Sequence, residues 1–244
     1  MAGLLTAAHA LRGDIGATAH DTARSVEEVG YAALPGVVSA RWLDSARSLA
    51  TTVNRPDTQE VLLEDMAAGD GEAIDALLAD PELAGFLESV ATRLHPRSDP
   101  DDRHVDVSLR IINGPDEGEQ PLWFHYDATV VTVVFPIEIP ATGGELVMHA
   151  NRRPFRRLVL TNIVEKMVTQ SNAYRRRFEA GEPAAVSLVP GNAYVFSGYR
   201  SYHATLPCPV GGRRITLMVH YKDAHGGSKM LQGAKSLYHR ITGA

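Results

Sequence analysis

The stretch Trp123–Phe135, WFHYDATVVTVVF, places a histidine and a carboxylate two residues apart, directly before a run of threonines and valines. Side chains at positions i and i+2 of an extended segment point to the same face, so His125 and Asp127 can converge on one point. The β-branched run behind them predicts a strand. The pair is either one half of a metal site or a hydrogen-bonded His–Asp pair at a strand edge.

A metal site with a preferred geometry needs a third ligand, and His203 is the candidate, in a predicted loop between two predicted strands. Two histidines and one carboxylate that leave the remaining positions open form the facial triad of non-haem Fe(II) oxygenases. We therefore predict His125, Asp127 and His203 as the metal ligands and the catalytic centre. The remaining histidines near these segments are interpreted as two half-buried strand residues and one surface residue, namely His149, His220 and His104.

An arginine pair opens the last predicted strand, and one of its members could hold the far carboxylate of a dicarboxylate cosubstrate. Such a carboxylate is best held by a planar, always-charged, bidentate donor. Arg214 would share a face with Thr216, whose hydroxyl could add a hydrogen bond. Arg213 would point the other way. We prefer Arg214, and Arg213 stays open as the alternative.

Taken in order, His125-x-Asp127, the turn Gly143-Gly144-Glu145-Leu146, Pro190-Gly191, His203 and Gly-Gly-Arg-Arg-Ile-Thr resemble the iron(II)- and 2-oxoglutarate-dependent oxygenases, in particular the prolyl-hydroxylase-like branch. The resemblance covers roughly residues 104–223. One departure concerns the strand before the HxD motif, which often carries a tyrosine in the family. Here that strand reads SLRIINGP, and Arg110 or Asn113 could take the tyrosine's place.

The resemblance implies a double-stranded β-helix (a jelly-roll or cupin-like barrel) and two cofactors, Fe(II) and 2-oxoglutarate. The cosubstrate would chelate iron through its 1-carboxylate and 2-oxo group and reach Arg214 with its 5-carboxylate. With O₂ it would leave as succinate and CO₂, while an unactivated C–H bond of a small-molecule or amino-acid-like substrate is oxidised. A carboxylate at position 127 favours hydroxylation or another oxidation over halogenation.

The elements that must position these residues give an α+β fold. Residues 1–100 show apolar spacings of three and four, with Ser39 and Asp80 as predicted helix N-caps. A β-rich region with Gly/Pro turns follows, and a helical insertion over 152–182 interrupts it as a possible lid. We expect one domain over 1–244, with a helical support region in 1–100 and the catalytic barrel in 104–223.

Composition narrows the partners. The chain has 244 residues, a net charge of -5 and one cysteine, Cys208. No apolar run reaches the roughly 18 residues that a membrane span needs. We therefore expect a cytoplasmic protein with no nucleic-acid or membrane partner and an undetermined oligomeric state. The Ala/Arg-rich composition is compatible with bacterial natural-product tailoring.

Charge is unevenly distributed along the chain. The segment 57–88 holds ten acids and no lysine or arginine, whereas 152–177 holds eight bases and one acid. The basic segment could attract an anionic or carrier-bound substrate, or it could pair with the acidic segment, within one chain or across a dimer. Two other functions also remain open: a non-catalytic cupin-type barrel that binds a small molecule, and a cupin-type metal-dependent hydrolase or isomerase.

Overall fold

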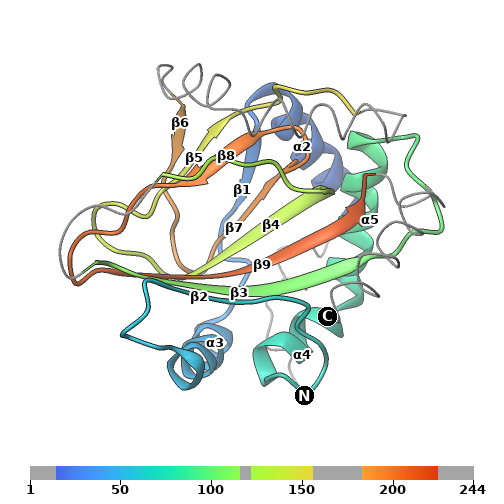
Figure 1. The fold of residues 1–244 in the computed structure, drawn as a ribbon. Helices are drawn as coiled ribbons and strands as arrows, with labels where there is room; N and C mark the ends of the chain where they lie inside the picture. The colour runs from blue at the N-terminus through green and yellow to red at the C-terminus, as the bar shows by residue number, and fades with distance from the viewer. Residues whose placement is uncertain (1–14, 116–121, 156–182, 225–244) are drawn as a thin grey trace, which may run out of the picture.

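The structure is a computed structural model that describes residues 15–115, 122–155 and 183–224. Within these ranges, nine strands form two antiparallel sheets (Figure 1). The larger sheet has the order β1-β7-β4-β9-β3-β2, and the smaller one the order β6-β5-β8. The strands are β1 (Tyr31–Leu34), β2 (Glu60–Leu63), β3 (Val105–Asn113), β4 (Thr129–Glu138), β5 (Leu146–His149), β6 (Ala184–Val186), β7 (Ala193–Phe196), β8 (Tyr202–Thr205) and β9 (Arg213–Asp223).

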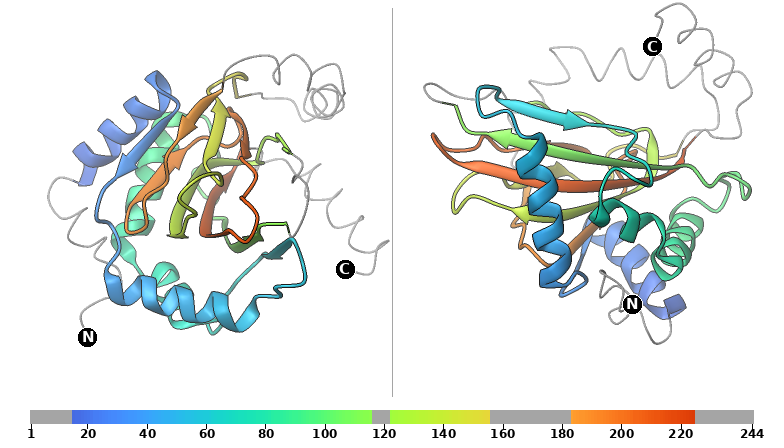
Figure 2. Two further views of the ribbon diagram at one scale, coloured as in Figure 1. Left: turned by 90° about the vertical axis from the view of Figure 1, so that its left-hand side faces the viewer. Right: turned by 90° about the horizontal axis from the view of Figure 1, so that it is seen from below.

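The described helices lie on the outer side of the larger sheet (Figure 2): α2, α3 and α5 contact its strands, and α4 packs against α3. They are α2 (Ile15–Glu28), α3 (Ala40–Val53), α4 (Glu72–Leu78) and α5 (Pro81–Leu94). The two predicted N-caps are confirmed. The Ser39 hydroxyl accepts from the Trp42 amide, and the Asp80 carboxylate accepts from the amides of Glu82 and Leu83, with Pro81 at the first helical position.

Strand β4 is buried on both faces, which explains why its sequence is a continuous β-branched run rather than an alternation of polar and apolar residues. Val131, Val133 and Phe135 belong to the main core between the larger sheet and the helices. Val134 faces the other way and packs with residues of both sheets. The inner face of the larger sheet is consequently partly apolar and partly free to carry chemistry.

The expected α+β character is confirmed, as are the strands predicted around the HxD motif and at the end of the chain. The mainly helical region also contributes β2, an edge strand with alternating burial that pairs with β3. One expectation was wrong in detail. His203 lies on strand β8 rather than in a loop, because β8 pairs with β5.

The predicted helical insertion lies mostly outside the described residues, since 156–182 are not among them. Its first residues, 152–155, carry no helix. The possible lid therefore stays a prediction. Among the described residues, no helix is long and apolar enough to cross a membrane.

Candidate metal centre and cosubstrate pocket

His125 and His203 are brought together by an isolated antiparallel bridge between the segment before β4 and strand β8. Their backbones exchange two hydrogen bonds, with N···O distances of 2.9 and 3.0 Å. The two imidazole centroids lie 4.4 Å apart. Since i and i+2 share a face, Asp127 also points to this place, as the HxD spacing predicted.

The Oδ1 atom of Asp127 lies 3.6 Å from Nε2 of His125 and 3.5 Å from Nε2 of His203. One ligand atom from each of these residues lies within 4.8 Å of the others. The Nδ1 atoms are turned away, toward the carbonyls of Trp123 (3.4 Å) and Ser201 (3.0 Å). A carbonyl on the second ring nitrogen fixes which nitrogen can bind a metal, so both Nε2 atoms are presented to the same point.

Protonation states favour a cation at this point. Burial would raise the pKa of Asp127, but His203, His220 and His125 and the hydrogen bond from Thr132 outweigh it and lower the pKa. Burial lowers the pKa of His203 to about 4, against the opposing effect of Asp127. Near neutral pH the site therefore holds a carboxylate and a neutral buried imidazole, the forms that bind a metal.

The second oxygen of Asp127 is also held. The Thr132 hydroxyl donates to Oδ2 at 2.6 Å, and Nδ1 of His220 lies 3.7 Å from the same atom. His220 is a partly buried strand residue, as expected, but its place beside Asp127 was not predicted. The signal was available: His220 lies six residues after Arg214, on the same face of β9.

Two residues distant in sequence pack tightly against Asp127. A Cβ built on Gly198 would lie 1.8 Å from Asp127 Oδ2, so only glycine fits there. Arg153 is buried, donates to the Asp127 carbonyl at 3.1 Å, and places its guanidinium over the rings of Tyr126 and Tyr199. Arg153 was counted within the basic segment, yet it supports the site from inside the protein.

Arg214 is 2% exposed and lines the same cavity as His125, Asp127 and His203. Its Nε donates to the Gly144 carbonyl at 2.9 Å and its Nη1 to the Thr216 hydroxyl at 3.0 Å. Gly143 and Gly144 both have left-handed φ angles, +75° and +72°, which explains the paired glycines of the turn. Burial and nearby Arg110 lower the pKa of Arg214 to about 9, so the side chain stays charged at neutral pH. Among the described residues no carboxylate neutralises it.

The neighbouring candidates have other partners. Arg213 points away from the cavity and makes a bidentate pair with Glu138, at 2.9 and 2.7 Å. Asn113 donates to Asn54, Arg55 and Thr58, and so fixes a loop. Arg110 lines the cavity and pairs with Glu60 at 2.7 Å. Of the two residues considered in place of the tyrosine, Arg110 is therefore the one that faces the cavity.

The cavity measures about 600 Å³ and joins the His125–Asp127–His203 cluster to Arg214. Its inner lining includes Val134, Leu146, Phe196 and Met218. A cavity of this size has room for a small dicarboxylate, and its lining places apolar side chains beside the cluster and the guanidinium of Arg214. The donor set of two imidazoles and one carboxylate with open positions suits a ferrous ion.

A scan against protein-family models finds no match, and a search of the curated proteins finds none either. Solved structures do resemble the chain. An oxidoreductase of the 2OG-Fe(II) oxygenase family from Burkholderia pseudomallei is 17% identical with a TM-score of 0.55, over 85% of this chain and 90% of that one. A Pseudomonas putida prolyl-4-hydroxylase is 14% identical with a TM-score of 0.54, over 84% of this chain and 98% of that one.

A third similar structure is the non-heme alpha ketoglutarate dependent epimerase SnoN from nogalamycin biosynthesis, 16% identical with a TM-score of 0.62, over 85% of this chain and 84% of that one. The same epimerase has also been solved with Fe3+, alpha ketoglutarate and a nogalamycin compound. The chain therefore has the fold of these oxygenases, and its His-Asp-His cluster fits their facial triad.

Proposed function

We propose that the protein is a non-haem Fe(II)- and 2-oxoglutarate-dependent dioxygenase that oxidises a C–H bond of a small-molecule or amino-acid-like substrate, most simply by hydroxylation. The observation that carries this is one cavity with a three-ligand cluster at one place and, at another, a buried arginine that has no carboxylate partner among the residues the structure describes. The fold similarity to 2OG-Fe(II) oxygenases supports it.

Each residue then has a definite role. His125, Asp127 and His203 would hold the ferrous ion, with Thr132 keeping the second Asp127 oxygen turned away from it. Arg214 would bind the 5-carboxylate of 2-oxoglutarate, with the Thr216 hydroxyl beside it. Once bound, iron and cosubstrate supply the oxidising chemistry, in which O₂ is consumed and 2-oxoglutarate leaves as succinate and CO₂. The chain contributes placement and a water-poor pocket.

The type of oxidation depends on what the substrate presents to the site. Asp127 occupies the position that a halide would need, so the complete triad favours hydroxylation or another oxidation over halogenation. Similar structures include prolyl hydroxylases and an epimerase, so stereochemical inversion belongs to the same range of outcomes. The proposal that the basic segment 152–177 recognises an anionic or carrier-bound substrate is independent of this and concerns residues largely outside the described ranges.

The test is anaerobic reconstitution with Fe(II), followed by addition of 2-oxoglutarate. We expect a visible charge-transfer band, and succinate release once O₂ is admitted. A band without succinate release against any amino acid or metabolite pool would indicate the non-catalytic barrel. Turnover of a substrate without O₂ and 2-oxoglutarate would indicate the hydrolase or isomerase. Absence of the band with iron bound would overturn the proposal.

A further inference from the structure

The inner face of the larger sheet continues past the metal centre onto strands β3 and β2, and this outer part of the cavity has no role in holding iron or cosubstrate. Cross-strand register places Asp106 of β3 opposite His220 of β9, and His220 opposite Thr132 of β4. Thr132 contacts the metal-facing Asp127. With neighbouring strands about 4.8 Å apart, the Asp106 position lies roughly 10 Å across the sheet from the Thr132 position.

The outer part of the cavity is acidic. Its lining includes four carboxylates, Glu60, Glu64, Asp106 and Asp223, and one arginine, Arg110, besides the deeper Arg214. Arg110 is already paired with Glu60. This wall therefore keeps an excess of negative charge facing the space that a substrate would enter, which favours a cationic ligand.

A second, independent observation points to a ligand here. Ser108 is 3% exposed and lines the cavity two residues from Asp106, on the same face of β3. Its hydroxyl makes no hydrogen bond within the described ranges and is not enclosed by protein atoms, so it is available to a ligand that enters the cavity. Trp123, 59% exposed, adds an aromatic face to the same lining.

We propose that this wall binds a protonated amine of the substrate, with Asp106 as the principal anion and Ser108 as a hydrogen-bond partner. The substrate class is thus a small molecule that carries an ammonium group several bonds away from the carbon that is oxidised. The inference rests on the proposed function for its meaning as a substrate site. The binding of an amine can nevertheless be measured without turnover.

The experiment uses two probes that differ in charge and hardly in shape, 5-aminopentan-1-ol and pentane-1,5-diol. Their binding to the full chain is titrated by ligand-observed NMR, once without additions and once with Fe(II) and 2-oxoglutarate under argon. We expect the amine to bind at least about fivefold more tightly than the diol, since a charge-assisted hydrogen bond contributes more than a neutral one. Equal binding of the two probes, or binding of neither, would overturn the inference.

Variants locate the amine. Asp106→Asn keeps an oxygen that can accept from the Asp65 amide, as the native carboxylate does at 3.2 Å, so the fold is preserved. It should weaken amine binding by about fivefold or more and leave diol binding unchanged. Ser108→Ala should weaken amine binding to a smaller extent. Asp57→Asn, an exposed acid outside the cavity lining, is the matched control and should change neither. Unchanged amine binding in Asp106→Asn would overturn the assignment.

The two proposals fail separately. Selective amine binding lost in Asp106→Asn, without succinate release under any condition, would retain the amine site and remove the oxygenase function. Succinate release with no preference for the amine would do the opposite.

Discussion

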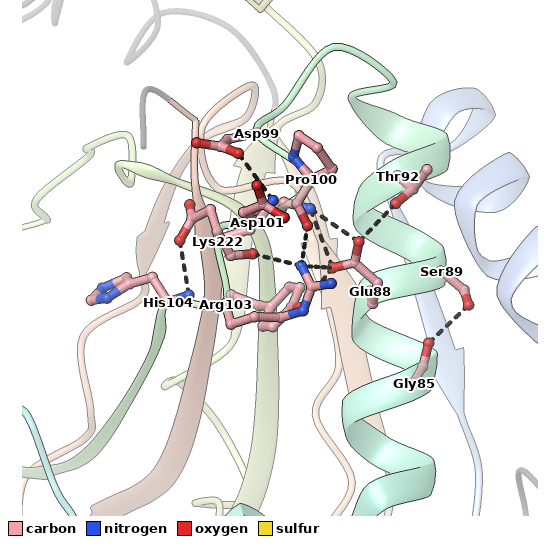
Figure 3. A network of polar contacts seen from close by, with 12 residues as sticks. Gly85, Glu88, Ser89, Thr92, Asp99, Pro100, Asp101, Arg103, His104 and Lys222 are labelled. Carbon is pink, nitrogen blue, oxygen red and sulfur yellow. Dashed lines mark hydrogen bonds and ion pairs between the residues drawn. The ribbon is translucent and has the colours of Figure 1, made fainter. Parts of the chain in front are cut away.

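Two carboxylates approach the end of strand β9 from opposite faces of the larger sheet, Asp127 from the cavity and Glu88 from helix α5. Burial would raise the pKa of each, and in each the surrounding groups outweigh burial and lower it. Around Asp127 these groups are mainly histidines. Around Glu88 they are the Tyr221 hydroxyl at 2.7 Å, the Lys222 ammonium at 3.1 and 3.2 Å, and Arg103 at 3.5 Å. Figure 3 shows Lys222 and Arg103 beside Glu88.

The difference lies in whether the neighbours carry a permanent charge. Lysine and arginine pair with Glu88 within its own cluster, so that cluster is closed and structural. Around Asp127 the neighbours are imidazoles, and its Oδ1 faces the Nε2 atoms of His125 and His203, so an added cation can bind between them. The backbone enforces this separation: Lys222 has a left-handed φ of +60°, and its ammonium contacts Glu88 beside Tyr221 instead of following the alternation of β9 into the cavity. A lysine in the cavity would compete with the metal.

The largest expected effect is on metal binding. Asp127→Ala should weaken Fe(II) or Co(II) binding by more than about 100-fold, because loss of partners outside the ligand set alone costs roughly 10–100-fold. Calorimetric titration under argon measures it. The control is Glu88→Ala on the other face of β9, which should retain native affinity. Equal losses in the two variants would mean that the two clusters are not distinct.

The next effect separates two neighbouring arginines. Arg214→Ala should raise the dissociation constant of 2-oxoglutarate by about 30-fold or more, since a partly buried charge-assisted pair typically contributes about 2–5 kcal/mol. Arg213→Ala should change it little, because Arg213 is paired with Glu138 on the outer face. Absorbance titration of the iron-loaded protein reports both, and the reverse ranking would reassign the cosubstrate anchor.

A pH prediction sharpens the comparison in the metal-free protein. The pKa of His203 is about 4 in the folded chain and near 6.5 when unfolded, so the folded state binds fewer protons between these values. The stabilising contribution is complete above pH 6.5 and is lost as pH falls toward 4. Between pH 7 and 5 this should cost about 2 kcal/mol of unfolding free energy.

Denaturant unfolding at several pH values measures that loss. His203→Asn should remove it, whereas Glu88→Ala should retain it because the pKa of Glu88 is lowered from its ordinary value, away from this range. A pH dependence that survives in His203→Asn would have to come from another group.

Features of the fold and the site could be predicted from the sequence where they depend on residues close together in the chain. The i, i+2 spacing of His125 and Asp127, the N-caps and the β-branched run of β4 are local, and local rules were enough. That Arg214 and Thr216 share one face of β9 also followed from the alternation of side chains along a strand. His203 was chosen as the third ligand from its order in the chain, but its strand was missed because β8 exists only through pairing with β5 and with His125.

Other features depend on tertiary contacts that no local pattern encodes. Gly198 must lack a side chain because Asp127 lies against it, although the two are distant in sequence. Arg153 was read as part of a basic surface run, and the stacking against Tyr126 and Tyr199 that buries it could not be read from charge alone. The side chain of Lys222 departs from the alternation of β9 because its φ angle is +60°.

The smallest expected effect concerns the closed cluster. Glu88→Ala leaves the Lys222 ammonium, on a residue only 1% exposed, without its carboxylate. Removing one partner of a buried ion pair costs about 3–5 kcal/mol, and partial exposure of Glu88 reduces this to about 1–2 kcal/mol of unfolding free energy. Arg103→Ala is the matched control, since that pair is long and exposed and its loss should cost less than about 0.5 kcal/mol. Chemical denaturation of the two variants beside the native chain decides: equal stabilities would show that Lys222 finds another partner, and that the two sides of β9 differ less than their charges indicate.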